Sequence, residues 1–232
     1  MPQADYQSLR FARIRVAKLN PTTFAPLVGT QNGYVSNSQI QVQIGTNVTT
    51  GDSFEQKNGD GAVCATFTGA DALKNITLTL DLCSADPILR SFLTGGTLMT
   101  DPANSFLPVG YQAASVTSTV TAPVCLEGWT RAYDGSVPAV PTTTTPDAAY
   151  WHWVFPNCTF VEDTTTLSNG IATFPVKGIS VENTALTANG PFNDWPLWAA
   201  DNGGVTRSYG YFLDATTLPV VTDARIAVPS GS

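Results

Sequence analysis

Residues Lys74–Cys83 carry the strictest pattern in the chain, an alternation of apolar and polar side chains. The apolar members are Ile76, Leu78, Leu80 and Leu82, and the polar members are Thr77, Thr79, Asp81 and Cys83. Because successive side chains of a strand point to opposite faces, this period predicts a β-strand with one face buried in a core. The other face is polar and has to meet water or a partner molecule.

The segments on either side predict a hairpin and a helix. Ala62–Thr68 alternates more weakly, and the turn-forming residues Gly69-Ala70-Asp71 separate it from the strand, so we expect the two segments to pair. After the strand, Asp86 is suited to cap a helix over residues 87–94 that begins with Pro87. Four apolar residues share one stripe of this helix, and Gly95-Gly96 ends it. So short a helix has to pack against a sheet to be stable.

Other alternating segments extend the β pattern. Arg10–Leu19 predicts a strand with Arg13 and Arg15 on a basic outer face. Ser38–Val48 alternates Ile40, Val42 and Ile44 with Gln39, Gln41 and Gln43. Further strands are expected at 124–133, 150–160 and 171–182, whereas 49–61 and 97–114 are expected to be long or irregular loops.

The expected fold class is therefore mainly β. We predict a single β-sandwich domain over residues 1–232, with one short flanking helix near residues 87–94 and long loops. Within this domain we expect a flexible N-terminal arm at 1–9 and a C-terminal arm at 214–232.

Composition and charge limit the possible functions. The chain has a net charge of −7 and a pI near 4.5, which argues against binding DNA through a basic face, because phosphate contacts need Lys and Arg. It has no apolar run long enough for a transmembrane helix and no signal-peptide pattern, so we expect it to stay in the cytosol where it is made, without membrane contact. Its cysteines, Cys64, Cys83, Cys125 and Cys158, form no CxxC pair and are expected to be free buried thiols rather than two disulfides.

No arrangement of residues predicts an enzyme or a cofactor site. His152 is the single histidine, which disfavours zinc, and no phosphate loop or nucleophile elbow is present. The acidic segment Thr49–Gly61 invites a calcium interpretation, but it lacks the ligand order of an EF-hand. We therefore expect no enzymatic activity, no cofactor and no metal.

Three pieces of the sequence together resemble a known family. The run Gly51–Cys64, the strand Asn75–Cys83 and the helix from Asp86-Pro87 to Gly95-Gly96 are similar to the major tail protein of long-tailed phages of actinobacteria. The resemblance implies a structural virion protein that forms hexameric rings, which stack into the tail tube through which DNA leaves. It implies assembly in the host cytoplasm with copies of itself, a tape-measure protein and terminator or initiator proteins. It also implies a loop that reaches an adjacent subunit, whose candidate residues here are Asp52, Phe54, Glu55, Lys57 and Asp60.

A conduit for DNA should not bind its cargo, and the polar strand faces suit that role. Neutral polar groups bind the DNA phosphates only weakly, and acidic groups repel them. The candidate lumen-facing residues are Thr77, Thr79, Asp81, Gln39, Gln41 and Gln43. For the glutamine row, an ordinary solvated strand face is an equally good interpretation.

A binding module is the second hypothesis. A β-sandwich that binds a carbohydrate or a receptor would use Trp195, Trp198 and the Trp151–Trp153 region as stacking surfaces. The alternate spacing of Trp151, Trp153 and Phe155 also fits one face of a core strand, which is the interpretation favoured for that segment.

Overall fold

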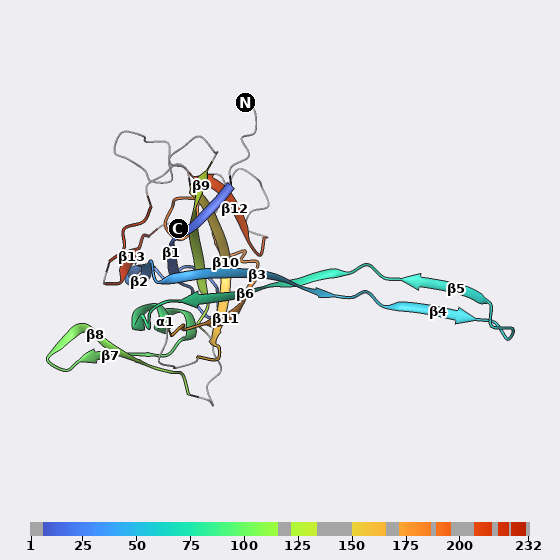
Figure 1. Cartoon of the computed structure of the whole chain (residues 1–232), viewed down its shortest axis with the longest axis horizontal. Helices are drawn as coiled ribbons and strands as arrows, with labels where there is room; N and C mark the ends of the chain where they lie inside the picture. Colours follow the sequence, from blue (N-terminus) through green and yellow to red (C-terminus); the bar gives the residue numbers. More distant parts are fainter. Residues whose placement is uncertain are drawn as a thin grey trace, which may run out of the picture.

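The computed structural model describes residues 7–115, 122–133, 150–165, 172–186, 189–195, 207–214, 218–222 and 224–230. One antiparallel sheet of nine strands forms the body, in the order β13-β2-β1-β9-β10-β11-β6-β3, with β12 paired to β10 (Figure 1). The strands are β1 (Gln7–Lys18), β2 (Gly29–Ser36), β3 (Gln39–Thr49), β6 (Ala72–Leu82), β9 (Val124–Tyr133), β10 (Tyr150–Glu162), β11 (Val176–Val181), β12 (Gly210–Asp214) and β13 (Ile226–Val228).

The sheet folds over so that two of its parts enclose the main core. Gln39 at the start of β3 donates a hydrogen bond from Nε2 to the carbonyl of Phe11 in β1, at 3.3 Å. Between these layers, Ile14 and Val16 of β1 belong to the same buried cluster as Leu78 and Leu80 of β6. The domain is mainly β and sandwich-like with one short helix, as the sequence predicted.

Helix α1 (Pro87–Thr94) follows its sequence signals closely. The Asp86 carboxylate accepts a hydrogen bond from the Leu89 amide at 3.0 Å, and Gly95 ends the helix in the left-handed conformation at φ 71°. Leu89, Phe92 and Leu93 are fully buried under the sheet. Each such side chain stabilises the fold by roughly 1.5–3 kcal/mol.

The predicted pairing of Ala62–Thr68 with the strand after it is wrong. β5 (Val63–Thr68) pairs with β4 (Ser53–Lys57), whereas β6 pairs with β3 and β11. Residues 69–71 do not turn the chain, because the Gly69 amide donates to the Asp52 carbonyl at 2.8 Å and keeps the two strands side by side. The turn lies at Asn58–Ala62, where the Asn58 side chain accepts from the amides of Asp60 and Ala62.

The segment Thr49–Gly61, expected to be a loop, is therefore half of a long two-stranded arm. We call residues 46–75 the hairpin arm; it continues β3 and β6 through β4 and β5 and extends far from the body (Figure 1). A side chain at Gly51 would lie 2.2 Å from the Gly69 carbonyl oxygen. Glycine at position 51 is what lets the two strands approach at that point.

A second hairpin replaces the irregular segment expected at 97–114. β7 (Thr97–Asp101) pairs with β8 (Asn104–Gln112), and together they form a separate two-stranded sheet. Pro108 is tolerated because it lies opposite Thr100, between two shifts of the strand register, and Pro102 lies in the turn.

Parts of both expected arms pair with the sheet. Residues 7–9, expected within an N-terminal arm, pair with β9 as the start of β1. Within the expected C-terminal arm 214–232, β13 pairs with β2, because the free edge of β2 offers unpaired backbone groups. Residues 1–6 lie outside the described part.

Candidate functional site

Five of the six candidate lumen-facing residues share one sheet face. Gln41 lies opposite Asp81, Gln43 opposite Thr79, and Gly45 opposite Thr77 in the β3–β6 register. Gln41 donates a hydrogen bond from Nε2 to the Asp81 carboxylate at 2.5 Å. The alternation of β6 is as predicted, with Ile76, Leu78, Leu80 and Leu82 buried on the other face. We call the side that carries these five residues the polar face.

Gln39 is the exception, and its prediction is wrong. A shift in register between Gln39 and Gln41 leaves Ile40 as an extra residue, so Gln39 lies opposite the buried Leu82. Its side chain is itself buried and donates to the Phe11 carbonyl. A β-bulge moves one residue to the opposite face, and regular alternation in the sequence does not reveal it.

The same bulge affects the apolar side of β3. Val42 packs against the main core, whereas Ile40 and Ile44 remain exposed and line an open cavity of about 300 Å³ with Trp153 of β10. The aliphatic row of β3 is therefore only partly a core face.

The polar face continues onto β11 and carries little charge. Lys177 lies opposite Thr79 and pairs with Asp163, with 2.7 Å between Nζ and Oδ2. The hydrogen bond from Lys177 lowers the pKa of the Asp163 carboxyl. Asp81 receives its hydrogen bond from the neutral Gln41 amide, so that contact leaves its negative charge in place.

All five candidate inter-subunit residues, Asp52, Phe54, Glu55, Lys57 and Asp60, lie on the hairpin arm. Phe54 lies directly opposite Phe67, and their side chains are 57% and 62% exposed. Nearer the body, the exposed Val48 lies opposite the exposed Leu73. On the other face of β4, Lys57 pairs with Glu55 at 3.1 Å. The arm therefore has one aromatic and one polar face.

Acidic residues of the arm do not gather into a metal site. Among the described residues, no group of three or more His, Cys, Asp or Glu side chains is placed to hold a metal ion. Asp60 lies in the turn at the tip, and Asp52 lies beside the Gly51–Gly69 contact.

A buried charged cluster on β1, β9 and β10 was not predicted. Glu127 is fully buried; its Oε2 contacts Nη2 of Arg15 and lies 2.9 Å from His152 Nε2. Arg15 also pairs with Asp194 at 2.6 Å, and its guanidinium lies over the Phe192 ring at 3.9 Å. Arg15 is thus buried, and the expected basic outer face of β1 is wrong at this position.

The charged groups of the cluster clamp the segment 189–195 to the sheet. Burial favours the neutral form of Glu127, but the Arg15 charge and the His152 hydrogen bond outweigh it and lower the pKa of Glu127 to about 2. Burial and the nearby Glu127 raise the pKa of Asp194. His152 is 0% exposed and stacks on Trp129 with 4.2 Å between ring centroids. Through Arg15 and Asp194 the cluster holds residues 189–195 against the sheet.

The tryptophans proposed as a sugar platform are largely covered. Trp195 is 0% exposed, and Trp151 and Trp153 are half-buried with Tyr211 packed against both, at 5.5 and 4.6 Å between ring centroids. Trp198 lies outside the described residues.

All four cysteines are free, but only Cys125 and Cys158 are buried. Cys64 and Cys83 are exposed, because Cys64 lies on the hairpin arm and Cys83 follows the last residue of β6. The expectation of buried thiols is therefore wrong for two of the four.

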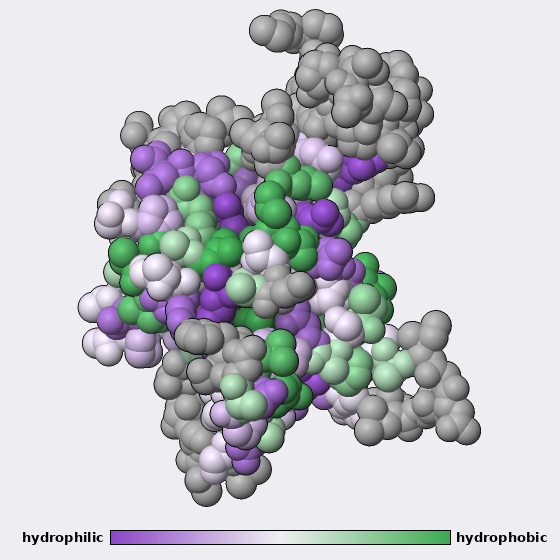
Figure 2. All heavy atoms as spheres, turned by 90° about the vertical axis from the view of Figure 1, so that its left-hand side faces the viewer, coloured by the Kyte–Doolittle hydropathy of each residue, from purple (hydrophilic) through white to green (hydrophobic). Residues whose placement is uncertain are grey.

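On the side of the body away from the arm, apolar residues form patches between hydrophilic ones (Figure 2). The β7–β8 hairpin contributes the exposed side chains of Met99, Leu107 and Val109.

Two comparisons of the sequence with known proteins give no match. No protein-family model matches the chain, and no curated protein matches its sequence. In the part of the chain that the structure describes, no helix has the length and apolar character needed to span a bilayer.

Proposed function

We propose that this protein is a structural subunit that polymerises through its hairpin arm into stacked rings, forming the tail tube of a long-tailed phage. The observation that carries the proposal is the opposed pair Phe54 and Phe67, exposed on β4 and β5, which among the described strands pair only with each other. Burying each ring in a partner would contribute roughly 1.5–3 kcal/mol. A two-stranded ribbon is marginally stable alone in water, which favours a role completed by contact with another molecule.

The position of the arm supports head-to-tail assembly. It projects from one side of the body, whereas α1, β13 and the β7–β8 hairpin lie on the other side (Figure 1). An arm that docks on a different patch of the next copy makes a heterologous contact, and such contacts close into rings when the rotation allows. The hexameric ring number comes from the resemblance to the tail-protein family.

In the proposed tube, the polar face lines the lumen. Its threonines and glutamines form no fixed charge pattern, and Asp81 repels the phosphates of passing DNA. The negative charge of the whole chain acts in the same direction. The tape-measure, terminator and initiator proteins are the partners that this role requires.

The test is assembly of the full chain. Negative-stain electron microscopy and light scattering of the concentrated protein should show rings or tubes, and the double variant Phe54→Ser/Phe67→Ser should remain a folded monomer. Thr66→Ser, on the polar face of the arm, is the matched control and should assemble as the unaltered protein does. A protein that assembles equally well without both phenylalanines contradicts the role of the arm.

The carbohydrate-binding hypothesis is the weaker one, because Trp195 is buried. It is tested separately by titrating the monomer with sugars while following tryptophan fluorescence. A saturable change in the absence of assembly would favour it over the tube.

A further inference from the structure

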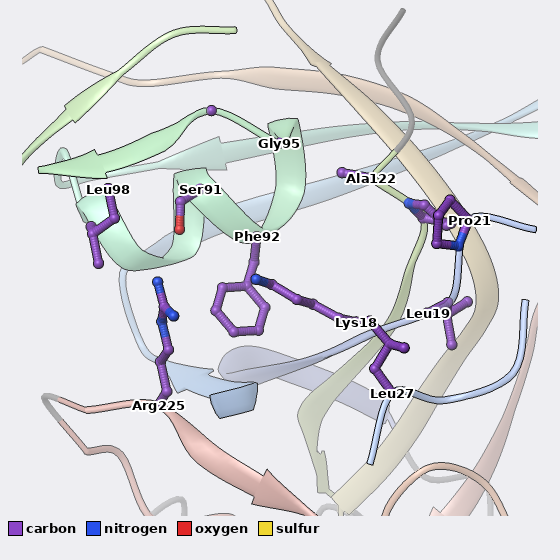
Figure 3. Close-up of a pocket in the computed structure, with 12 residues that line it drawn as sticks. Lys18, Leu19, Pro21, Leu27, Ser91, Phe92, Gly95, Leu98, Ala122 and Arg225 are labelled. Atoms are coloured by element: carbon purple, nitrogen blue, oxygen red, sulfur yellow. The ribbon is translucent and has the colours of Figure 1, made fainter. Parts of the chain in front are cut away.

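A cavity of about 260 Å³ opens on the side of the body away from the arm (Figures 1 and 3). It lies between the end of β1, the C-terminal end of α1 and the residue that precedes β13. Leu19, Leu27, Phe92 and Leu98 form apolar parts of its wall, and Lys18 and Arg225 provide its charged groups. We call it the α1 pocket.

The two cations of the α1 pocket converge on one aromatic ring. Lys18 Nζ lies 4.6 Å and Arg225 Cζ 5.7 Å from the centre of the Phe92 ring; the Lys18 side chain points toward the ring, and the Arg225 side chain extends beside it toward Ser91 (Figure 3). Arg225 donates to the neutral Gln31 side chain at 3.2 Å. None of the described residues that line the pocket is an aspartate or a glutamate.

The positive charges of Lys18 and Arg225 thus lie near each other in the partly buried α1 pocket. Burial and, secondarily, the positive charge of Arg225 lower the pKa of the Lys18 ammonium. A carboxylate between the two groups would relieve their repulsion and form charge-assisted hydrogen bonds with both.

We propose that the α1 pocket binds the carboxylate of Asp60 at the tip of the hairpin arm of a second copy of this chain. This inference rests on the proposed assembly through the arm. It names the surface on which the arm ends.

The tip of the arm has the shape and charge that the pocket requires. Asp60 is exposed between Gly59 and Gly61, and a Cβ at either glycine would have no atom within 4 Å, so the tip is slim and unobstructed. Asp60 is the charged residue of the turn Asn58–Ala62, and the nearest cation along the chain, Lys57, pairs with Glu55 at 3.1 Å. A negative tip and a positive pocket at opposite sides of one molecule are complementary for head-to-tail contact.

Zero-length carbodiimide coupling of the full chain tests this contact, because the reagent joins a carboxylate to an amine only where the two touch. We expect an intermolecular amide between Asp60 and Lys18, identified by mass spectrometry of the digested product. Asp60→Asn should lose both the product and most of the assembly. Lys18→Arg is the matched control, since it keeps the charge and the assembly but removes the reactive amine.

Charge exchange provides a second measurement. Asp60→Lys alone, and Lys18→Glu with Arg225→Glu, should each raise the critical concentration for assembly about tenfold. The variant that combines all three substitutions should recover most of that loss, because it restores opposite charges at every contact. Loss without recovery would overturn the pairing.

The outcomes separate this inference from the proposed function. Rings or tubes in which Lys18 couples to another carboxylate, or to none, overturn the pocket and leave the tube proposal intact. Coupled dimers that never close or stack support the pocket and contradict the tube. A protein that stays monomeric and gives no intermolecular coupling overturns both the pocket inference and the tube proposal.

Discussion

The body strands β3 and β6 and their continuations β4 and β5 in the hairpin arm both alternate apolar with polar side chains, but their apolar faces meet different surroundings. Where β3 and β6 belong to the body, the aliphatic side chains of β6 are buried in the main core, in the same cluster as residues of β1, β9, β10 and α1. Where the strands continue into the hairpin arm, Phe54, Phe67 and Leu73 are exposed. Alternation in a sequence thus states that a strand has an apolar face, but not which molecule covers it.

The largest loss of stability is expected for a substitution in the core of the body. Leu80→Ala should lower the free energy of unfolding by about 2–5 kcal/mol, because the side chain is fully buried between β6 and the opposite layer. Urea denaturation followed by tryptophan fluorescence measures this loss. A change below about 1 kcal/mol would mean that the core closes around the deletion and that the body is less tightly packed than its burial indicates.

Acid should weaken the clamp that holds residues 189–195 on the body. The pKa of Glu127 in the folded chain, about 2, lies below the ordinary value of 4.5, so its contribution is present above that ordinary value. The contribution, about 3 kcal/mol, is lost as the pH falls from 4.5 toward 2. Asp194, with a raised pKa, acts in the opposite direction.

The measurement is the difference in unfolding free energy between the unaltered protein and Glu127→Gln, followed from pH 6 to pH 3. That difference should shrink as the pH falls, since the variant lacks the carboxylate that titrates. A constant difference would contradict the assignment of the low pKa to Glu127.

The smallest effect on stability is expected in the arm. Phe67→Ala should change the free energy of unfolding of the monomer by no more than about 0.5 kcal/mol, because Phe67 is 62% exposed and its cross-strand partner Phe54 is itself exposed. The same denaturation assay measures it, at a concentration where light scattering finds monomer only. A loss comparable to that of Leu80→Ala would show that the arm folds back on its own body in solution.

Local signals predicted local structure well. Helix α1 could be predicted from Asp86, Pro87 and Gly95 alone, because capping acts over a few residues. The buried and polar faces of β6 could also be predicted, because the alternation of its own residues decides them. The position of Thr77, Thr79 and Asp81 on one face follows from the same alternation.

Pairing and long-range contacts could not be predicted in this way. Residues 69–71 have the composition of a turn, but the contact that decides their structure is with Asp52, on the other strand of the arm. The burial of Arg15 depends on Glu127 and Asp194, which are far away in the sequence. The α1 pocket is lined by residues from separate segments of the chain, and no motif or residue spacing in the sequence predicts that they come together.

The contact between Gly51 and Gly69 has a consequence for how relatives of this protein can be recognised. A Cβ at position 51 would lie 2.2 Å from the Gly69 carbonyl oxygen, whereas a Cβ at position 69 would lie 3.2 Å from the nearest backbone atom of the facing strand, which is a tight contact but a less severe one. Selection should therefore hold glycine strictly at the first position and more loosely at the second while the surrounding residues diverge. In a chain that matches no family model, such an unequal pair of glycines across two long strands is a mark of common descent that can outlast overall sequence similarity.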